Sequence, residues 1–169
     1  VVHSWPSVRA VSRARLTPSG HLIYIAVDDS LREVDWAGEP VRSFRTGNGK
    51  YFPHHDLQWL PGDGLLGIFR APGKPTDNVL AVNSEGVLEW TWESHLHLEE
   101  ELAVEAFKET DLTHFNSVQS IPDNPHAEAG DMRFKAGNVL VSSRHLSTVF
   151  LIDRPSGEVV WKYTDKLDW

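Results

Sequence analysis

The chain alternates short apolar runs with turns, and this spacing predicts strands rather than long helices. Runs such as "HLIYIAV" and "LLGIFR" are bounded by Gly, Pro, Asp or Asn, which are typical turn residues. Apolar and polar positions alternate in "VFLID" and "VVWKY", as in strands with one buried face. The pattern therefore predicts an all-β fold.

Three segments of the chain repeat one layout of four strands, in which the last strand is rich in aromatic residues. They are residues 14–47, 53–92 and 113–164. The turn glycines Gly20, Gly64 and Gly137 precede equivalent strands of the three segments. A repeated four-stranded antiparallel meander is the blade of a β-propeller. We therefore predict a β-propeller with about three blades, in one domain over residues 1–169.

Two segments interrupt the repeat. Residues 94–110 are acidic and carry leucines at nearly helical spacing, which predicts one short helical insertion. Residues 123–136 are rich in Pro, Ala and charged residues, which predicts an exposed loop. Tryptophans recur at the strand ends, and we expect these indoles to pack between blades: Trp36, Trp90, Trp92 and Trp161.

Three blades do not close a propeller, which typically has about four to eight. The chain is therefore expected to be partial. The missing blades are expected from the same protein, from a homodimer mate or from another chain, because an open ring exposes strand edges and apolar faces.

Composition excludes several partners. A net charge of −8 argues against nucleic acid, which is bound by clustered Lys and Arg. No apolar run approaches the roughly 20 residues of a membrane-spanning helix, so no membrane insertion is expected. The absence of cysteine removes disulfides, thiolate metal sites and thiol nucleophiles.

Polar residues cluster where two innermost strands begin. "YFPHHDLQWLP" and "LTHFNSVQSIP" each open the first strand of a blade, and aligning them places His55 opposite Asn116. Side chains on a strand alternate with period two. His55, His114 and Asn116 are therefore expected on one side, while His54 faces the other.

Arg144 ends the next strand of the third blade and should lie beside the start of that blade. Together with His55, His114 and Asn116 it would form a local anion site in an acidic protein. His145 is expected to face away from Arg144 and to bond within its blade.

No metal site is predicted. Adjacent residues of a strand point to opposite faces, so His54, His55 and Asp56 cannot all approach one zinc or iron ion, and no third spaced ligand is evident. Asp56 could instead orient His55 or cap a turn.

The segments "HHDLQWLPGDGLL", "DLTHFNSVQ" and "NVLVSSRHLSTVFLIDRPSGEVVWKY" resemble the bacterial arylsulfate sulfotransferases. These six-bladed propellers move a sulfuryl group from an aryl sulfate to a phenol through a sulfohistidine, without a cofactor. The resemblance implies that His114 and Arg144 bind the sulfuryl group. His55 matches the other catalytic channel histidine, with His54 as the alternative. His54, Asn116 and Asp56 are expected to bind substrate.

The resemblance also implies that the attacking histidine comes from a blade after "SGEVVWKY", so the isolated chain is expected to be inactive. A periplasmic or extracellular location is implied too, with an aryl sulfate and a phenol as small-molecule partners. The alternative is a non-catalytic ligand-binding or scaffold propeller that keeps an anion pocket in its channel. A histidine in the following blade would discriminate the two.

Overall fold

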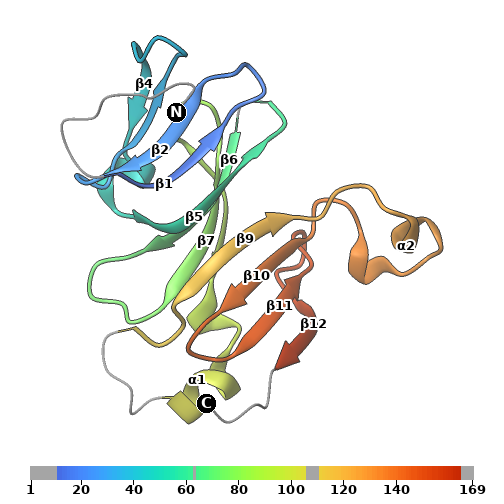
Figure 1. The fold of residues 1–169 in the computed structure, drawn as a ribbon. Coiled ribbons are helices and arrows are strands. Elements are labelled where there is room, and N and C mark those ends of the chain that lie inside the picture. The colour runs from blue at the N-terminus through green and yellow to red at the C-terminus, as the bar shows by residue number, and fades with distance from the viewer. Residues whose placement is uncertain (1–10, 63, 106–110, 165–169) are drawn as a thin grey trace.

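A computed structural model describes residues 11–62, 64–105 and 111–164 (Figure 1). Its strands form three separate four-stranded sheets, each ordered as in the chain with antiparallel neighbours. The predicted all-β fold of about three blades is confirmed. The part of the predicted helical insertion that includes Phe107 lies outside the described residues.

The first blade consists of β1 (Val11–Leu16), β2 (Leu22–Ala26), β3 (Leu31–Val34) and β4 (Pro40–Phe44). The second consists of β5 (Phe52–Leu60), β6 (Gly64–Arg70), β7 (Asp77–Val82) and β8 (Leu88–Glu93). The third consists of β9 (Phe115–Ser120), β10 (Val139–Ser143), β11 (Thr148–Ile152) and β12 (Val159–Thr164). A short 3₁₀ helix, η1 (Thr46–Gly49), connects the first two blades.

The second blade is buried on both faces because it lies between the other two (Figure 1). Side chains on β6 alternate: Leu65 and Phe69 face the first blade, whereas Leu66 and Ile68 face the third. All of β7 is buried as well. Burial on both faces explains why these strands are almost continuously apolar.

The tryptophans divide into two groups. Trp92 is 1% exposed, and its indole N–H donates to the carbonyl of Gly157 at 2.9 Å. Trp90 is partly buried and donates to the carbonyl of Arg154. The other two are not covered by the described blades: Trp36 is 54% exposed in the turn after β3, and Trp161 is 36% exposed on the outermost strand of the third blade.

The insertion after β8 contains η2 (Ser94–Leu96) and α1 (Glu99–Glu105), with Leu98 buried in the core. The segment predicted as a loop contains α2 (Pro125–Glu128) and η3 (Met132–Phe134). Asn124 caps α2 by accepting from two main-chain N–H groups, and a proline follows at the first helical position. None of the described helices is long and apolar enough to cross a membrane.

Asp56 joins the inner strands of all three blades. Its side chain is 2% exposed. One carboxylate oxygen accepts from Arg13 at 2.8 Å and Arg15 at 2.9 Å, both on β1, and the other accepts from the main-chain N–H of Val118 on β9. These partners match neither of the two roles considered for Asp56, which were to orient His55 or to cap a turn. Its hydrogen bonds connect blades instead.

We expect Asp56→Asn to lower the free energy of unfolding by about 1.5–3 kcal/mol, the usual contribution of hydrogen bonds to a charged group. The amide keeps the size of the side chain but removes its charge and one acceptor. Urea denaturation monitored by tryptophan fluorescence measures the change.

Asp131→Asn is the matched control, because Asp131 pairs with Arg133 at the surface and exposed ion pairs contribute little. Equal stability losses in the two variants would contradict the role given to Asp56.

Candidate active site

Four histidines gather where the inner strands of the second and third blades begin. His54 and His55 lie in β5, His114 immediately precedes β9, and His145 follows β10. Ring centroids are 3.9 Å apart for His54 and His55, 4.6 Å for His55 and His114, and 4.7 Å for His114 and His145. We call these four residues the histidine cluster.

A bulge in β5 turns two consecutive histidines into this cluster. Pro53 pairs with Phe69 and Leu57 with Gly67, so the residues from 54 to 56 stand opposite one residue of β6. His55 has φ 54°, in the left-handed region that side chains other than glycine rarely adopt. Bulges re-aim side chains, and here the period-two alternation is lost. The expectation that His54 faces away from His55 was therefore wrong.

A second bulge lies at the start of β9. Ser117 pairs with Ser142, but Phe115 pairs with Ser143, which leaves Asn116 as the extra residue. The Asn116 side chain is exposed and makes no hydrogen bond within the described part of the chain. His114, with φ 44°, adopts a left-handed conformation like that of His55. The structure joins His114 to His55 and leaves Asn116 outside these contacts.

His55 and His114 contact each other directly. Their Nε2 atoms are 3.0 Å apart, so this hydrogen bond contains one proton. His114 Nδ1 lies against the carboxylate of Asp111, which can only accept while ionised. The neutral His114 therefore carries its proton on Nδ1, and its Nε2 accepts from His55 Nε2–H. The partners, rather than observed hydrogens, assign these tautomers.

Asp77 supports the cluster from a completely buried position at the start of β7. One oxygen accepts from His54 Nδ1 at 2.8 Å and from Arg70 Nε at 3.0 Å. The other accepts from the Thr113 hydroxyl at 3.1 Å and the Phe115 N–H at 2.7 Å. Burial alone would raise the pKa of Asp77, but the hydrogen bonds from His54, Phe115 and Arg70 outweigh it and lower that pKa.

Asp111 is the second carboxylate of the cluster. It accepts from His114 Nδ1 and from the Arg70 guanidinium. Burial raises the pKa of Asp111, and the hydrogen bonds from His114 and Arg70 more than compensate, so the pKa is lowered. Arg70 thus bridges Asp77 and Asp111, which belong to different blades.

His145 belongs to the cluster, although the sequence predicted that it faces away from Arg144 and bonds within its blade. Its Nδ1 donates to the main-chain carbonyl of Asp111 at 2.5 Å, and its ring lies beside that of His114. Residues 144–147 form a turn rather than a strand, so the period-two argument does not apply to them. Ending the predicted strand at Ser143 would have placed His145 in a turn, where its side chain is not bound to the alternation of a strand.

Arg144 lies next to His114. Its main-chain N–H donates to the His114 carbonyl at 3.0 Å. The side chain is exposed and forms no hydrogen bond with the other described residues. Its guanidinium therefore retains its donors for a ligand.

Asp111, His114 and His145 are the described residues whose types and spacing could hold a metal ion, with candidate ligand atoms within 4.8 Å of one another. A cation there would have to replace Arg70 on Asp111 and the proton on His114 Nδ1. The observed bonds instead orient the imidazoles through their Nδ1 atoms. We therefore treat the group as a histidine site rather than a metal centre.

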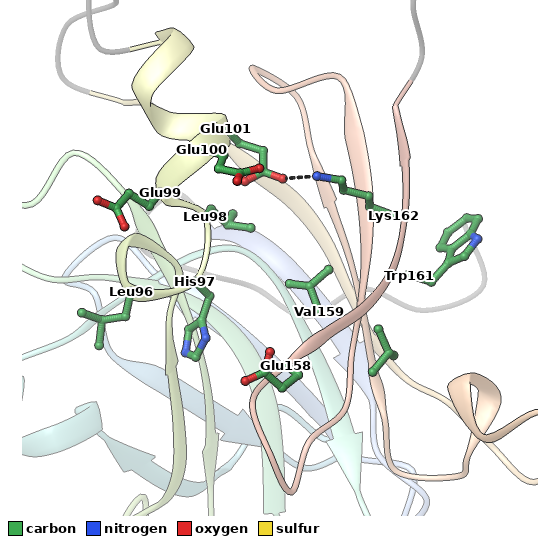
Figure 2. Close-up of a pocket in the computed structure, with 11 residues that line it drawn as sticks. Leu96, His97, Leu98, Glu99, Glu100, Glu101, Glu158, Val159, Trp161 and Lys162 are labelled. Carbon is green, nitrogen blue, oxygen red and sulfur yellow. Dashed lines mark hydrogen bonds and ion pairs between the residues drawn. The ribbon is translucent and has the colours of Figure 1, made fainter.

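A separate pocket of about 510 Å³ lies between the insertion and β12 (Figure 2). Glu99, Glu100, Glu101 and Glu158 line it, and Lys162 pairs with Glu101 at 2.7 Å. This surplus of carboxylates disfavours an anionic ligand. The histidine cluster is the better candidate for an anion.

The stability of the fold should depend on pH through His55. Burial, followed by the charges of His54 and His114, lowers the pKa of His55 from its ordinary value of 6.5. The unfolded chain therefore takes up this proton at a higher pH than the folded protein. The free energy of unfolding should fall as pH drops below 6.5 and through the folded pKa. Urea denaturation from about pH 8 to pH 5 measures the slope.

His55→Asn should reduce this pH-dependent loss, because asparagine does not titrate and tolerates the left-handed backbone. His126→Asn, on the exposed α2, is the control that should leave the slope unchanged. A slope that is the same in wild type and His55→Asn would contradict the assignment.

Comparisons with known proteins concern the fold and the family of the chain. A search of curated proteins finds no match. A crystal structure of a protein of unknown function from Bacteroides caccae matches with a TM-score of 0.56 and 15% identity, over 94% of this chain and 47% of that one. The Dos1 propeller matches with a TM-score of 0.33 and 15% identity, over 91% of this chain and 51% of that one.

The chain thus spans about half the length of these solved structures, and the first likeness concerns the fold alone. The family model for Arylsulfotransferase (ASST) matches residues 8–169, nearly the whole chain. The matched residues contain all three blades and the whole histidine cluster. The chain belongs to the arylsulfotransferase family.

Proposed function

We propose that this chain carries the sulfuryl-binding part of an aryl-sulfate sulfotransferase, with His55, His114 and Arg144 around the transferred group. The observation that carries the proposal is the 3.0 Å contact between His55 Nε2 and His114 Nε2, beside an arginine whose guanidinium has no partner among the described residues. Membership of the family supports the reaction class.

The side chains match the charge that sulfuryl transfer creates. Negative charge spreads over the three peripheral oxygens of the group in the transition state, much as in phosphoryl transfer. Arg144 supplies a planar fork of permanently charged donors, and an imidazole of the cluster supplies a further donor when it carries a second proton. Donors that are already in place need no reorganisation when the charge develops.

The transfer takes place in two displacements. An attacking imidazole nitrogen, from a further blade as the resemblance implies, forms a bond to sulfur while the bond from sulfur to the aryl oxygen breaks. The phenolate leaves with that electron pair and takes a proton. A phenol then attacks the sulfur of the sulfohistidine, releases its proton and restores the histidine.

The pair formed by His55 and His114 suits the proton steps. One proton lies between the two rings, and the lowered pKa of His55 favours its neutral form. A neutral imidazole can accept the proton of the incoming phenol, and an imidazolium can protonate the leaving phenolate. We assign His54 to substrate binding, since its ring packs against that of His55.

In the complete protein, which includes the blade with the attacking histidine, the transfer rate should depend on the shape of the Arg144 side chain as well as on its charge. Arg144→Lys should lower kcat by about 10²–10³, because one ammonium cannot reproduce the forked donor, and loss of one preorganised donor costs about 2.7–4 kcal/mol. Transfer from 4-nitrophenyl sulfate to phenol, followed by absorbance of the released nitrophenolate, measures the rate.

Arg133→Lys is the matched control, because Arg133 lies at the surface with Asp131 as its partner. Similar rates for wild type and Arg144→Lys would remove Arg144 from the mechanism. A complete wild-type protein that binds sulfate but never transfers it would favour the alternative, a propeller that only binds anions.

A further inference from the structure

We propose that Asp77 is the positioning residue of the site, because its buried carboxylate sets the tautomer and direction of His54 and, through Arg70, links His54 to His114. This inference rests on the proposed function, since it concerns how the same site is held ready for a sulfuryl anion. Asp77 itself does not contact the ligand in this proposal.

The tautomer of His54 follows from its partner. Its Nδ1 lies 2.8 Å from Asp77 Oδ1, and an ionised carboxylate can only accept. The neutral ring therefore carries its proton on Nδ1 and has a lone pair on Nε2. A carboxylate that fixes the Nδ1–H of a histidine in this way determines which nitrogen faces the chemistry.

Arg70 connects Asp77 to the carboxylate that orients His114. Its Nε donates to Asp77 and its Nη2 to Asp111, which in turn holds His114 Nδ1. The order of contacts is His54, Asp77, Arg70, Asp111 and His114. Two histidines are thus oriented in the same manner, with Nδ1 bound to a carboxylate. His114 Nε2 in turn contacts His55 Nε2.

Further hydrogen bonds fix the position of Asp77 itself. Its second oxygen accepts from Thr113 and from the main-chain N–H of Phe115, and its own N–H donates to the Thr113 hydroxyl at 2.8 Å. Its main-chain carbonyl accepts from Ser94. Because the residue is completely buried, these bonds do not compete with water.

The first blade offers a matched comparison. Glu33 is also buried, and it accepts from His21 Nδ1 at 2.8 Å and from Arg42 Nε at 2.6 Å. The chemistry of the triad is the same, but His21 belongs to the first blade and not to the histidine cluster. Glu33→Gln therefore perturbs an equivalent buried triad without altering the proposed site.

The test combines nitrogen NMR of ¹⁵N-histidine-labelled protein with titration calorimetry, using inorganic sulfate and phenyl sulfate as probes. In the wild type we expect the His54 signals of a protonated Nδ1. Asp77→Asn should remove that preference and weaken binding of both probes about 10-fold to 100-fold, as does loss of the partner that orients a metal-binding histidine. Glu33→Gln should leave both measurements at the site unchanged.

A double-mutant cycle separates positioning from general loss of stability. If Asp77 acts through His54, His54→Gln should weaken binding and Asp77→Asn should add little in that background. A wild-type His54 protonated mainly on Nε2 would overturn the proposal, even if Asp77→Asn does not fold. The proposal would also be overturned if Asp77→Asn changed the tautomer of His54 without changing the affinity for the probes. Additive losses of affinity in the double-mutant cycle would overturn it as well.

A wild type that shows the Nδ1 tautomer but binds neither probe would instead refute the proposed function, and the positioning role with it.

Discussion

The need to satisfy two buried carboxylates, Asp56 and Asp77, governs how the blades meet. Both belong to the second blade and are nearly or completely excluded from water. A buried charge is tolerated only when it is paired and hydrogen-bonded. Donors on the neighbouring blades meet this need: the main-chain N–H groups of Val118 and Phe115 on β9, and for Asp56 also two arginines on β1. The inner strands are thus held in one register by polar bonds that the apolar faces alone could not specify.

The same constraint creates the candidate site. The partners of Asp77 lie just before and at the start of β9, where the chain passes through His114, and the bulge in β5 that contains Asp56 also contains His54 and His55. The residues that connect the blades are therefore direct neighbours in sequence of the cluster histidines. Left-handed backbone at His55 and His114 is locally unfavourable and persists because the surrounding bonds determine it.

The blades could be predicted because each one repeats apolar strands and turn glycines, and the motif residues led to His55, His114 and Arg144. The bulges could not be predicted, since nothing in "PHHDL" shows that two histidines will share one side. The partners of Asp56 were missed for a related reason: Arg13 and Arg15 are about forty residues away and carry no motif. Position within a repeat also does not reveal whether a described blade covers a side chain, and Trp36 and Trp161 are exposed among these three blades.

The charges around the histidine cluster cancel, which favours transfer of a sulfuryl group over tight retention of a sulfate ester. The positive charges of Arg70 and Arg144 are offset by the negative charges of Asp77 and Asp111. The histidine cluster and these four residues together therefore have no net charge when the imidazoles are neutral. A permanently cationic site would stabilise bound sulfate esters as strongly as the transition state, and such uniform binding does not accelerate transfer. Here Arg70 is committed to the two carboxylates, and its guanidinium serves to fix them in place. Attraction for a sulfuryl group must come from Arg144, and from an oriented imidazole when it carries a second proton; both are positioned before the charge develops.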